Sequence, residues 1–169
     1  MAYKQPFDSE RALEAIVYIV SKLTRNQRHS IAKILYFADK VHLNDYGCLM
    51  FGDRYVKMSY GPVPSEAYDM IKYETQTHAK HEDLALAFTA NEGNVVKSLR
   101  EPDASKISEA MRLCIDQAIS EYGHLTFGEL TRLSHDDAWT SAETNRAMSF
   151  DAIVATLPDG PALMAHLNG

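Results

Sequence analysis

The sequence of 169 residues lacks the usual marks of an enzyme, a metal site or a membrane protein. Its two cysteines, Cys48 and Cys114, form no C-x-x-C pair, which excludes a zinc knuckle or a thioredoxin-like motif. Gly-x-Ser-x-Gly, P-loop and Gly-x-Gly-x-x-Gly patterns are absent. No apolar run approaches the roughly 20 residues of a membrane span, and the N-terminus does not resemble a secretory signal. We therefore expect a cytoplasmic protein with reduced cysteines, no cofactor and no membrane partner.

The histidines give only weak indications of chemistry. His78 and His81, beside Glu82, could share a helical face, but the segment is polar and offers no third ligand, so we expect no metal site. His135 and Trp139 are four residues apart, and on one helix the imidazole would pack on the indole. A structural role is the simpler interpretation of this pair, and we expect a protein that is not an enzyme.

The charge is unevenly distributed along the chain. The net charge is -6, but residues 21–40 carry five basic residues against one aspartate. The basic residues are Lys22, Arg25, Arg28, Lys33 and Lys40. The segment could be a patch for nucleic acid or for an acidic partner, or simply the solvated face of a helix. Because the rest of the chain is acidic and repels phosphate, we do not expect nucleic acid as the partner.

Apolar residues recur with helical spacing through most of the chain. They predict helices over residues 9–23, 25–46, 64–77, 107–122, 127–137 and 150–157. Capping-box spacing marks two helix starts, at Thr24 with Gln27 and at Thr126 with Glu129. Gly47 is placed to end the second helix. Residues 158–169 look like a weakly structured tail.

A small antiparallel sheet is expected between these helices. Residues 48–60 contain a Gly-Asp turn and an alternating run, which predict a hairpin, and residues 94–99 read as a further short strand after a turn over 91–94. The stretch Gly-Pro-Val-Pro at 61–64 closes the hairpin as a stiff corner. We expect the α+β class, predominantly helical: one compact domain over residues 10–157, with the sheet packed on a helical bundle.

Six of the nine tyrosines lie around the hairpin and its flanking helices. They are Tyr36, Tyr46, Tyr55, Tyr60, Tyr68 and Tyr73. Tyrosine provides a large contact area with a polar tip, which suits a protein interface, but it also packs well in a core. From the sequence the two roles are equally supported.

Three motifs follow one another in a specific order. The first lies on the second predicted helix and comprises Lys33, Leu35, Tyr36, Phe37, Ala38, His42 and Leu43. The second is the corner Tyr60, Gly61, Pro62, Val63 and Pro64, and the third is Leu133, Ser134, His135 and Trp139. Together they resemble the SocA-like antitoxin family, also called the Panacea domain. One departure is Ala138, where the family often has a proline before the tryptophan.

The resemblance implies a protein that neutralises a toxin, encoded by an adjacent gene, by direct contact. Some members of the family resemble adaptors that deliver the toxin to a protease. A nucleic-acid-binding regulator, or an adaptor carried by a phage or mobile element with another partner, stays open as an alternative. The candidate partner contacts are Tyr60, Val63, Tyr68, Tyr36 and Tyr55. We interpret the other motif residues, including His42 and His135, as parts of the scaffold.

Overall fold

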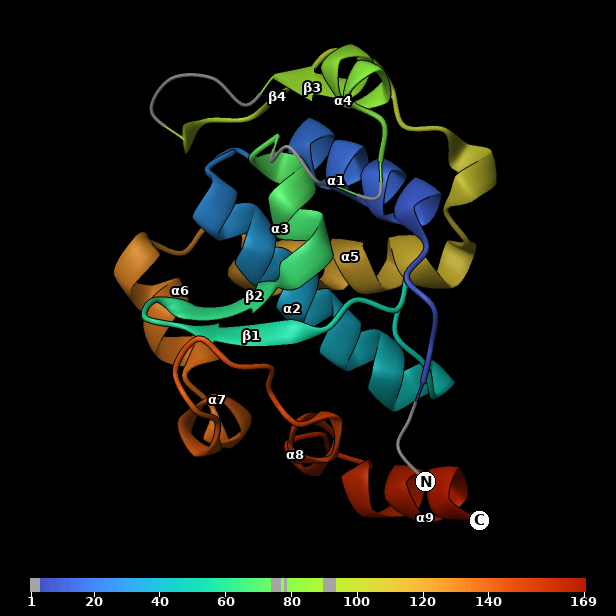
Figure 1. The fold of residues 1–169 in the computed structure, drawn as a ribbon, viewed down its shortest axis with the longest axis vertical. Helices are drawn as coiled ribbons and strands as arrows, with labels where there is room; N and C mark the ends of the chain where they lie inside the picture. Colours follow the sequence, from blue (N-terminus) through green and yellow to red (C-terminus); the bar gives the residue numbers. More distant parts are fainter. Residues whose placement is uncertain (1–3, 74–76, 78, 90–93) are drawn as a thin grey trace.

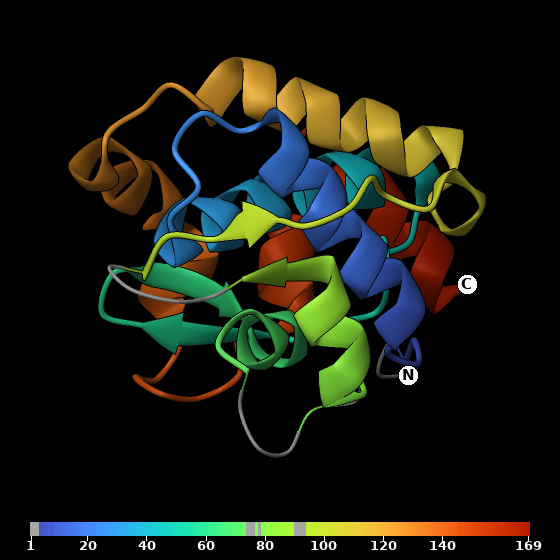
Figure 2. The same cartoon turned by 90° about the horizontal axis from the view of Figure 1, so that it is seen from above.

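Two long helices form the centre of the protein. The structure, a computed structural model, describes residues 4–73, 77, 79–89 and 94–169. Helices α1 (Ser9–Lys22) and α2 (Arg28–Tyr46) agree with the predicted ranges to within three residues at each end. α2 runs through the middle of the molecule and packs against both α1 and α5 (Glu109–Tyr122) (Figures 1 and 2). The predicted α+β class with a dominant helical part is confirmed.

The start of α2 differs from the prediction. The Thr24–Gln27 capping box is wrong, because the helix begins at Arg28 and the Gln27 side chain makes no capping hydrogen bond. The backbone before the helix pairs instead with a later segment, through an antiparallel bridge from Gln27 to Val95. Gly47 ends the helix as predicted, with a φ of 77° that a residue without Cβ adopts without strain.

The hairpin lies further along the chain than predicted. β1 (Tyr55–Met58) pairs antiparallel with β2 (Gly61–Pro64), so Gly-Pro-Val-Pro is a strand and not the corner that follows one. The Ser65 N–H donates to the Arg54 carbonyl at 2.9 Å and fixes which residues exchange hydrogen bonds. In this register Pro62 and Pro64 occupy positions whose N–H would point away from β1. The prolines therefore remove no hydrogen bond from the hairpin.

Helix α3 (Ser65–Ile71) begins directly after the hairpin and is shorter than the predicted helix over 64–77. Pro64 is its N-cap and has no side-chain oxygen to cap it. The Asp53 carboxylate, which lies before the hairpin in the sequence, caps the helix instead. It accepts the N–H groups of Glu66 and Ala67 at 3.0 and 2.8 Å. The helix ends at Ile71, and residues 74–76 of the predicted range lie outside the described ones.

A second small sheet corrects another prediction. β4 (Lys97–Ser98) forms within the predicted strand at 94–99, but it pairs with β3 (Phe88–Thr89) and does not extend the hairpin. Helix α4 (His81–Ala87) precedes β3. Most of the turn predicted over 91–94 lies outside the described residues.

Short helices follow one another through the C-terminal part as far as Asn168. A 3-10 turn, η2 (Ala104–Lys106), leads to α5 and α6 (Phe127–Ser134), and then to α7 (Asp137–Ser141) and α8 (Phe150–Ala155). α6 begins with the predicted capping box, complete in both directions. The prediction of a weakly structured tail over residues 158–169 is wrong, because this segment contains helix α9 (Gly160–Asn168). Leu163 buries its side chain in the core, and Asn44 accepts the Asp159 N–H before the helix at 2.9 Å.

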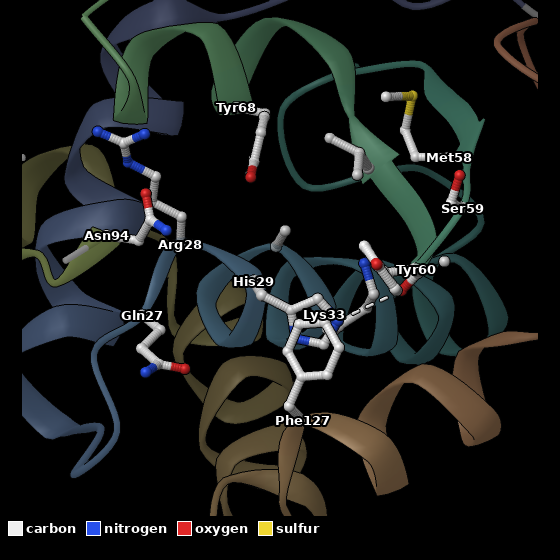
Figure 3. A pocket seen from close by; sticks show the side chains of 13 residues that line it. Gln27, Arg28, His29, Lys33, Met58, Ser59, Tyr60, Tyr68, Asn94 and Phe127 are labelled. Carbon is white, nitrogen blue, oxygen red and sulfur yellow. Dashed lines mark hydrogen bonds between the residues drawn. The ribbon is translucent and has the colours of Figure 1, made fainter.

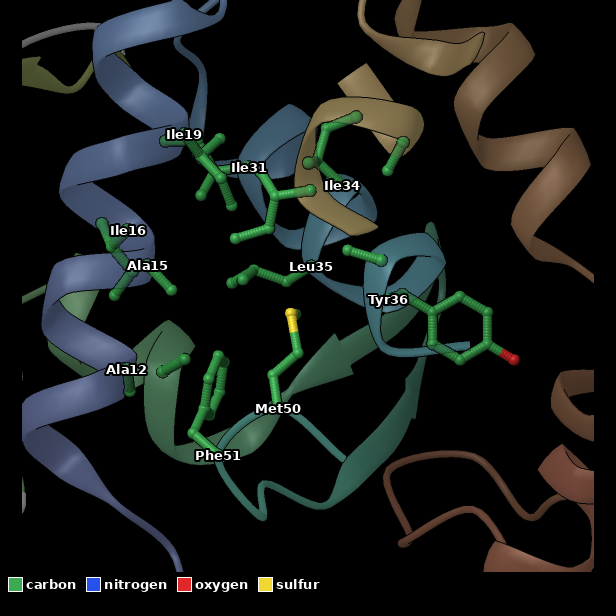
Figure 4. Packing of buried hydrophobic residues seen from close by; sticks show 14 of the residues in the cluster. Ala12, Ala15, Ile16, Ile19, Ile31, Ile34, Leu35, Tyr36, Met50 and Phe51 are labelled. Atoms are coloured by element: carbon green, nitrogen blue, oxygen red, sulfur yellow. The ribbon is translucent and has the colours of Figure 1, made fainter. Parts of the chain in front are cut away.

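The core lies where α1 and α2 face each other. Ile16 and Ile19 of α1 face Ile31 and Leu35 of α2, and Met50 and Phe51 lie below them (Figure 4). Both cysteines are free thiols. Within the described ranges, no helix combines the length and the apolar character that crossing a bilayer would require.

Candidate partner-binding surface

The three sequence motifs meet at one junction between α2, β2 and the end of α6. Lys33 of α2 is 1% exposed and donates from Nζ to the Pro62 carbonyl at 2.8 Å. Burial lowers the pKa of this amine from its usual value near 10.5 to about 7. The amine thus satisfies an outward-facing carbonyl of β2 and fastens the hairpin to α2.

Gly61 allows these elements to approach one another. Its φ is +115°, which side chains rarely adopt. A Cβ at this position would lie 2.3 Å from Ser134 Oγ and 2.6 Å from Lys33 Cε. A larger residue at position 61 would therefore collide with Lys33 of the first motif and Ser134 of the third.

Asp136 connects α2 to the start of α7. Its Oδ2 accepts the Tyr36 hydroxyl at 2.6 Å and pairs with Lys40 Nζ at 3.0 Å. Its Oδ1 accepts the N–H of Trp139 at 3.0 Å, which caps the short helix. Burial, together with the Asp136 charge, raises the pKa of Tyr36 far above its usual value. One carboxylate thus fixes a buried tyrosine, a lysine and a helix terminus.

The predicted packing of His135 on Trp139 is confirmed, although the two residues are not on one helix. Their rings stack at 3.6 Å with an angle of 4° between planes, His135 at the end of α6 and Trp139 in α7. Trp139 Nε1 donates to the Met58 carbonyl at 2.9 Å, and Lys57 Nζ lies 4.2 Å from the indole centroid. Burial lowers the pKa of His135. The pair holds the hairpin turn against α7.

Two further polar residues of α2 hold the segment before the hairpin. His42 Nδ1 contacts the Cys48 carbonyl at 2.7 Å, as expected for a buried histidine with a partner. Asp39 is also buried and accepts the Met50 N–H and the Tyr55 hydroxyl, both at 2.7 Å. Burial raises the pKa of Asp39 to about 7. Sequence periodicity did not single out this aspartate, because its partners lie beyond the helix.

The five candidate contact residues fall into two groups. Tyr36 and Tyr55 belong to the core, so their side chains do not reach the surface and we leave them out of the binding surface. Tyr60 is 60% exposed at the hairpin turn, while Val63 and Tyr68 are half-buried. These three residues line one cavity of about 460 Å³.

The cavity is bounded by the start of α2, the hairpin, α3 and the start of α6 (Figure 3). Phe127, which the sequence did not indicate, lies 45% exposed on its wall. The Phe127 ring stacks on His29 at 3.9 Å and meets the Tyr60 ring edge-on at 5.1 Å. Met58, 41% exposed, extends the apolar rim. We define the aromatic rim as Met58, Tyr60 and Phe127.

The basic segment of residues 21–40 does not form one exposed patch. Lys33 is buried, Lys40 pairs with Asp136, and Lys22 Nζ lies 3.0 Å from Asp116 Oδ1. Lys22, Lys33 and Lys40 are therefore engaged within the protein. Among the residues that the structure describes, no group of three or more histidine, cysteine or acidic side chains could hold a metal ion, and His78 lies outside them.

A Lys33→Met variant tests the role of the buried amine. In the unfolded chain the amine titrates near 10.5, but in the folded protein near 7, so between these pH values the unfolded state binds more protons. The free energy of unfolding of the wild type should rise relative to that of Lys33→Met over this window, by about 1.4 kcal/mol per pH unit. Urea unfolding at several pH values measures the difference. Parallel curves for the two proteins would show that the amine is not desolvated.

Comparison with protein families matches residues 31–140 to the family described as antitoxin SocA-like, Panacea domain. The matched stretch runs from α2 into α7 and contains all three motifs that meet at the junction. Comparison with curated proteins and with solved structures gave no significant match.

Proposed function

The chain belongs to the family of SocA-like antitoxins with a Panacea domain, and from this premise we propose that it neutralises a cognate toxin by binding it directly. The toxin is the product of an adjacent gene, and the pair acts in the cytoplasm. The protein itself performs no reaction, since the polar groups of the motifs hold the fold together: Lys33 bonds a backbone carbonyl, and Asp136 bonds Tyr36 and Lys40.

The aromatic rim is the observation that supports a protein partner. Large side chains that stay exposed beside a preformed cavity are typical of the residues that dominate binding energy in protein interfaces. Tyr60 is held by contacts on two sides, because His29 Nε2 lies 3.3 Å from its carbonyl and Phe127 packs against its ring. A rim that is already ordered loses little conformational entropy on binding.

The hairpin favours contact through side chains over the addition of a strand. Residues 145–148 already pair with the outer edge of β1, where the Lys57 N–H donates to Arg146 and the Met148 N–H to Tyr55. The other edge, on β2, presents Pro62 and Pro64, which have no N–H. Neither edge therefore offers the regular row of donors and acceptors that strand addition requires.

Co-expression tests the proposal. Tagged protein should co-purify with the product of the adjacent gene and relieve its toxicity to the host. Tyr60→Ala should weaken the complex by about 2 kcal/mol, or roughly thirtyfold, as expected for an exposed aromatic anchor. The measurement is the dissociation constant together with growth rescue. Repeating the rescue in a host without its energy-dependent proteases separates occlusion of the toxin from delivery to a protease.

Tyr46→Ala is the matched control. Tyr46 is 52% exposed, similar to Tyr60, but it lies at the opposite end of α2 from His29, roughly 25 Å away by the rise of a helix. This variant should bind as the wild type does. If no complex forms and growth is not rescued, the antitoxin function is wrong. If both variants bind fully, the partner uses another face.

A further inference from the structure

The cavity differs in charge from the rest of the protein. The chain has 23 acidic residues against 17 basic ones, yet none of the described residues that line the cavity is an aspartate or a glutamate. Arg28 and Lys33 contribute basic groups to its lining. In an acidic protein, the described lining of this cavity thus combines basic, neutral polar and apolar side chains and includes no carboxylate.

The amine of Lys33 adds to this imbalance. In the described part of the chain no carboxylate lies within ion-pair distance of Lys33 Nζ, and its hydrogen bond goes to the neutral Pro62 carbonyl. A buried cation without a counter-charge is unfavourable, and a nearby anion relieves this cost. Burial lowers the pKa of the amine to about 7, as the loss of water around a charged group is expected to do.

The apolar half of the cavity restricts the kind of anion. Tyr68 points from α3 toward the cavity, across from His29 and Phe127 (Figure 3). Val63 and Met58 complete this wall. His29 is neutral, since burial lowers its pKa to about 4, and its Nδ1 is buried without a partner among the described residues. The site therefore suits an apolar group with an adjoining carboxylate better than a bare phosphate.

We propose that this cavity seats an acidic segment of the partner protein, with an apolar or aromatic side chain inside the cavity and a carboxylate beside the Arg28 and Lys33 wall. The identity of that partner as a toxin rests on the proposed function, but the chemistry of the segment does not. Nucleic acid is the less favoured occupant, because Lys22 and Lys40 of the basic segment are paired with aspartates and cannot extend the site along a phosphate backbone.

Substitutions of opposite charge at Ser59 test the sign of the partner's charge. Ser59 lines the cavity, is exposed in the turn between β1 and β2, and has a backbone that any residue can adopt. Ser59→Glu should weaken the complex with the adjacent gene product about tenfold, while Ser59→Lys should leave it unchanged or tighten it. A loss with lysine but not with glutamate, or equal affinity for both, would overturn the proposal even if the antitoxin function holds.

A second measurement does not depend on the toxin. The amide resonances of the wild-type protein are followed during titration with acetyl-Glu-Phe-Glu-amide, with acetyl-Lys-Phe-Lys-amide as the control of equal size. The acidic peptide should shift resonances around His29, Tyr60 and Phe127 at millimolar concentration, and Ser59→Glu should reduce these shifts. If neither peptide binds, or the basic one binds better, the proposal is wrong. If inorganic phosphate or a thymidine oligonucleotide produces the larger shifts at the same residues, the cavity is a phosphate site instead.

Discussion

Gly61→Ala should leave little folded protein, with a loss of about 3–5 kcal/mol in the free energy of unfolding. Two effects act together at this position. The φ of +115° strains any residue with a Cβ, and that Cβ would lie 2.3 Å from Ser134 Oγ, a side chain that is fully buried. Relief would require α6 or Lys33 to move away from β2, which would separate the three motifs. Urea unfolding of the purified variant, or its yield if it does not fold, measures the loss.

Gly128→Ala is the matched control for this substitution. Gly128 lies inside α6, and an added Cβ would meet no atom within 4 Å. Alanine is the better helix former by about 1 kcal/mol, so this variant should be as stable as the wild type or slightly more so. Equal effects of the two substitutions would contradict the close packing at Gly61.

Asp136→Ala should cost about 3 kcal/mol of stability, the second largest effect that we expect from a single substitution. It leaves the buried Tyr36 hydroxyl without its acceptor, removes the partner of Lys40, and uncaps α7. These contributions share one carboxylate and are not additive. Because the Trp139 N–H loses its acceptor, we also expect the α7 region to exchange amide hydrogens faster. Chemical unfolding and hydrogen exchange measure the two consequences.

Asp137→Ala controls for the removal of one negative charge from the same turn. Asp137 is exposed and lies in the first turn of α7, where it makes no comparable set of contacts. Its replacement should change stability by no more than about 0.5 kcal/mol. If the Asp136 and Asp137 variants were equally stable, Asp136 would not be the connection between α2 and α7 that its contacts indicate.

The binding surface was only partly predictable. Tyr60 was found because aromatic residues cluster around the Gly-Pro corner, and it is exposed beside a cavity. Tyr36 and Tyr55 carried the same signal but lie in the core, since residue type alone does not distinguish an anchor from a core tyrosine. Phe127 was missed because it follows a helix cap about 65 residues beyond the corner, and only the packing of α6 on the hairpin brings it to the cavity.

The prolines of the corner show how local signals mislead. Two prolines beside a glycine favour a turn, and the sequence accordingly placed the strands before them. The stretch is a strand because its proline positions face away from β1 and because Lys33, 29 residues earlier, bonds the Pro62 carbonyl. The contact with Lys33, which is distant in sequence, thus outweighs the local preference of proline and glycine for a turn.

Features that depend on neighbouring residues could be predicted from the sequence. They are the central helices with their apolar spacing, the end of α2 at Gly47, the complete cap of α6 at Thr126, and the three motifs that identify the family. The place of the hairpin, the separate second sheet, the helix α9 and the cavity became visible only in the folded chain. The reason is that helix spacing and capping act over a few residues, whereas these features depend on contacts such as that of Tyr36 with Asp136, 100 residues apart. The local sequence does not specify which distant residue will form the hydrogen bond that a buried polar side chain needs.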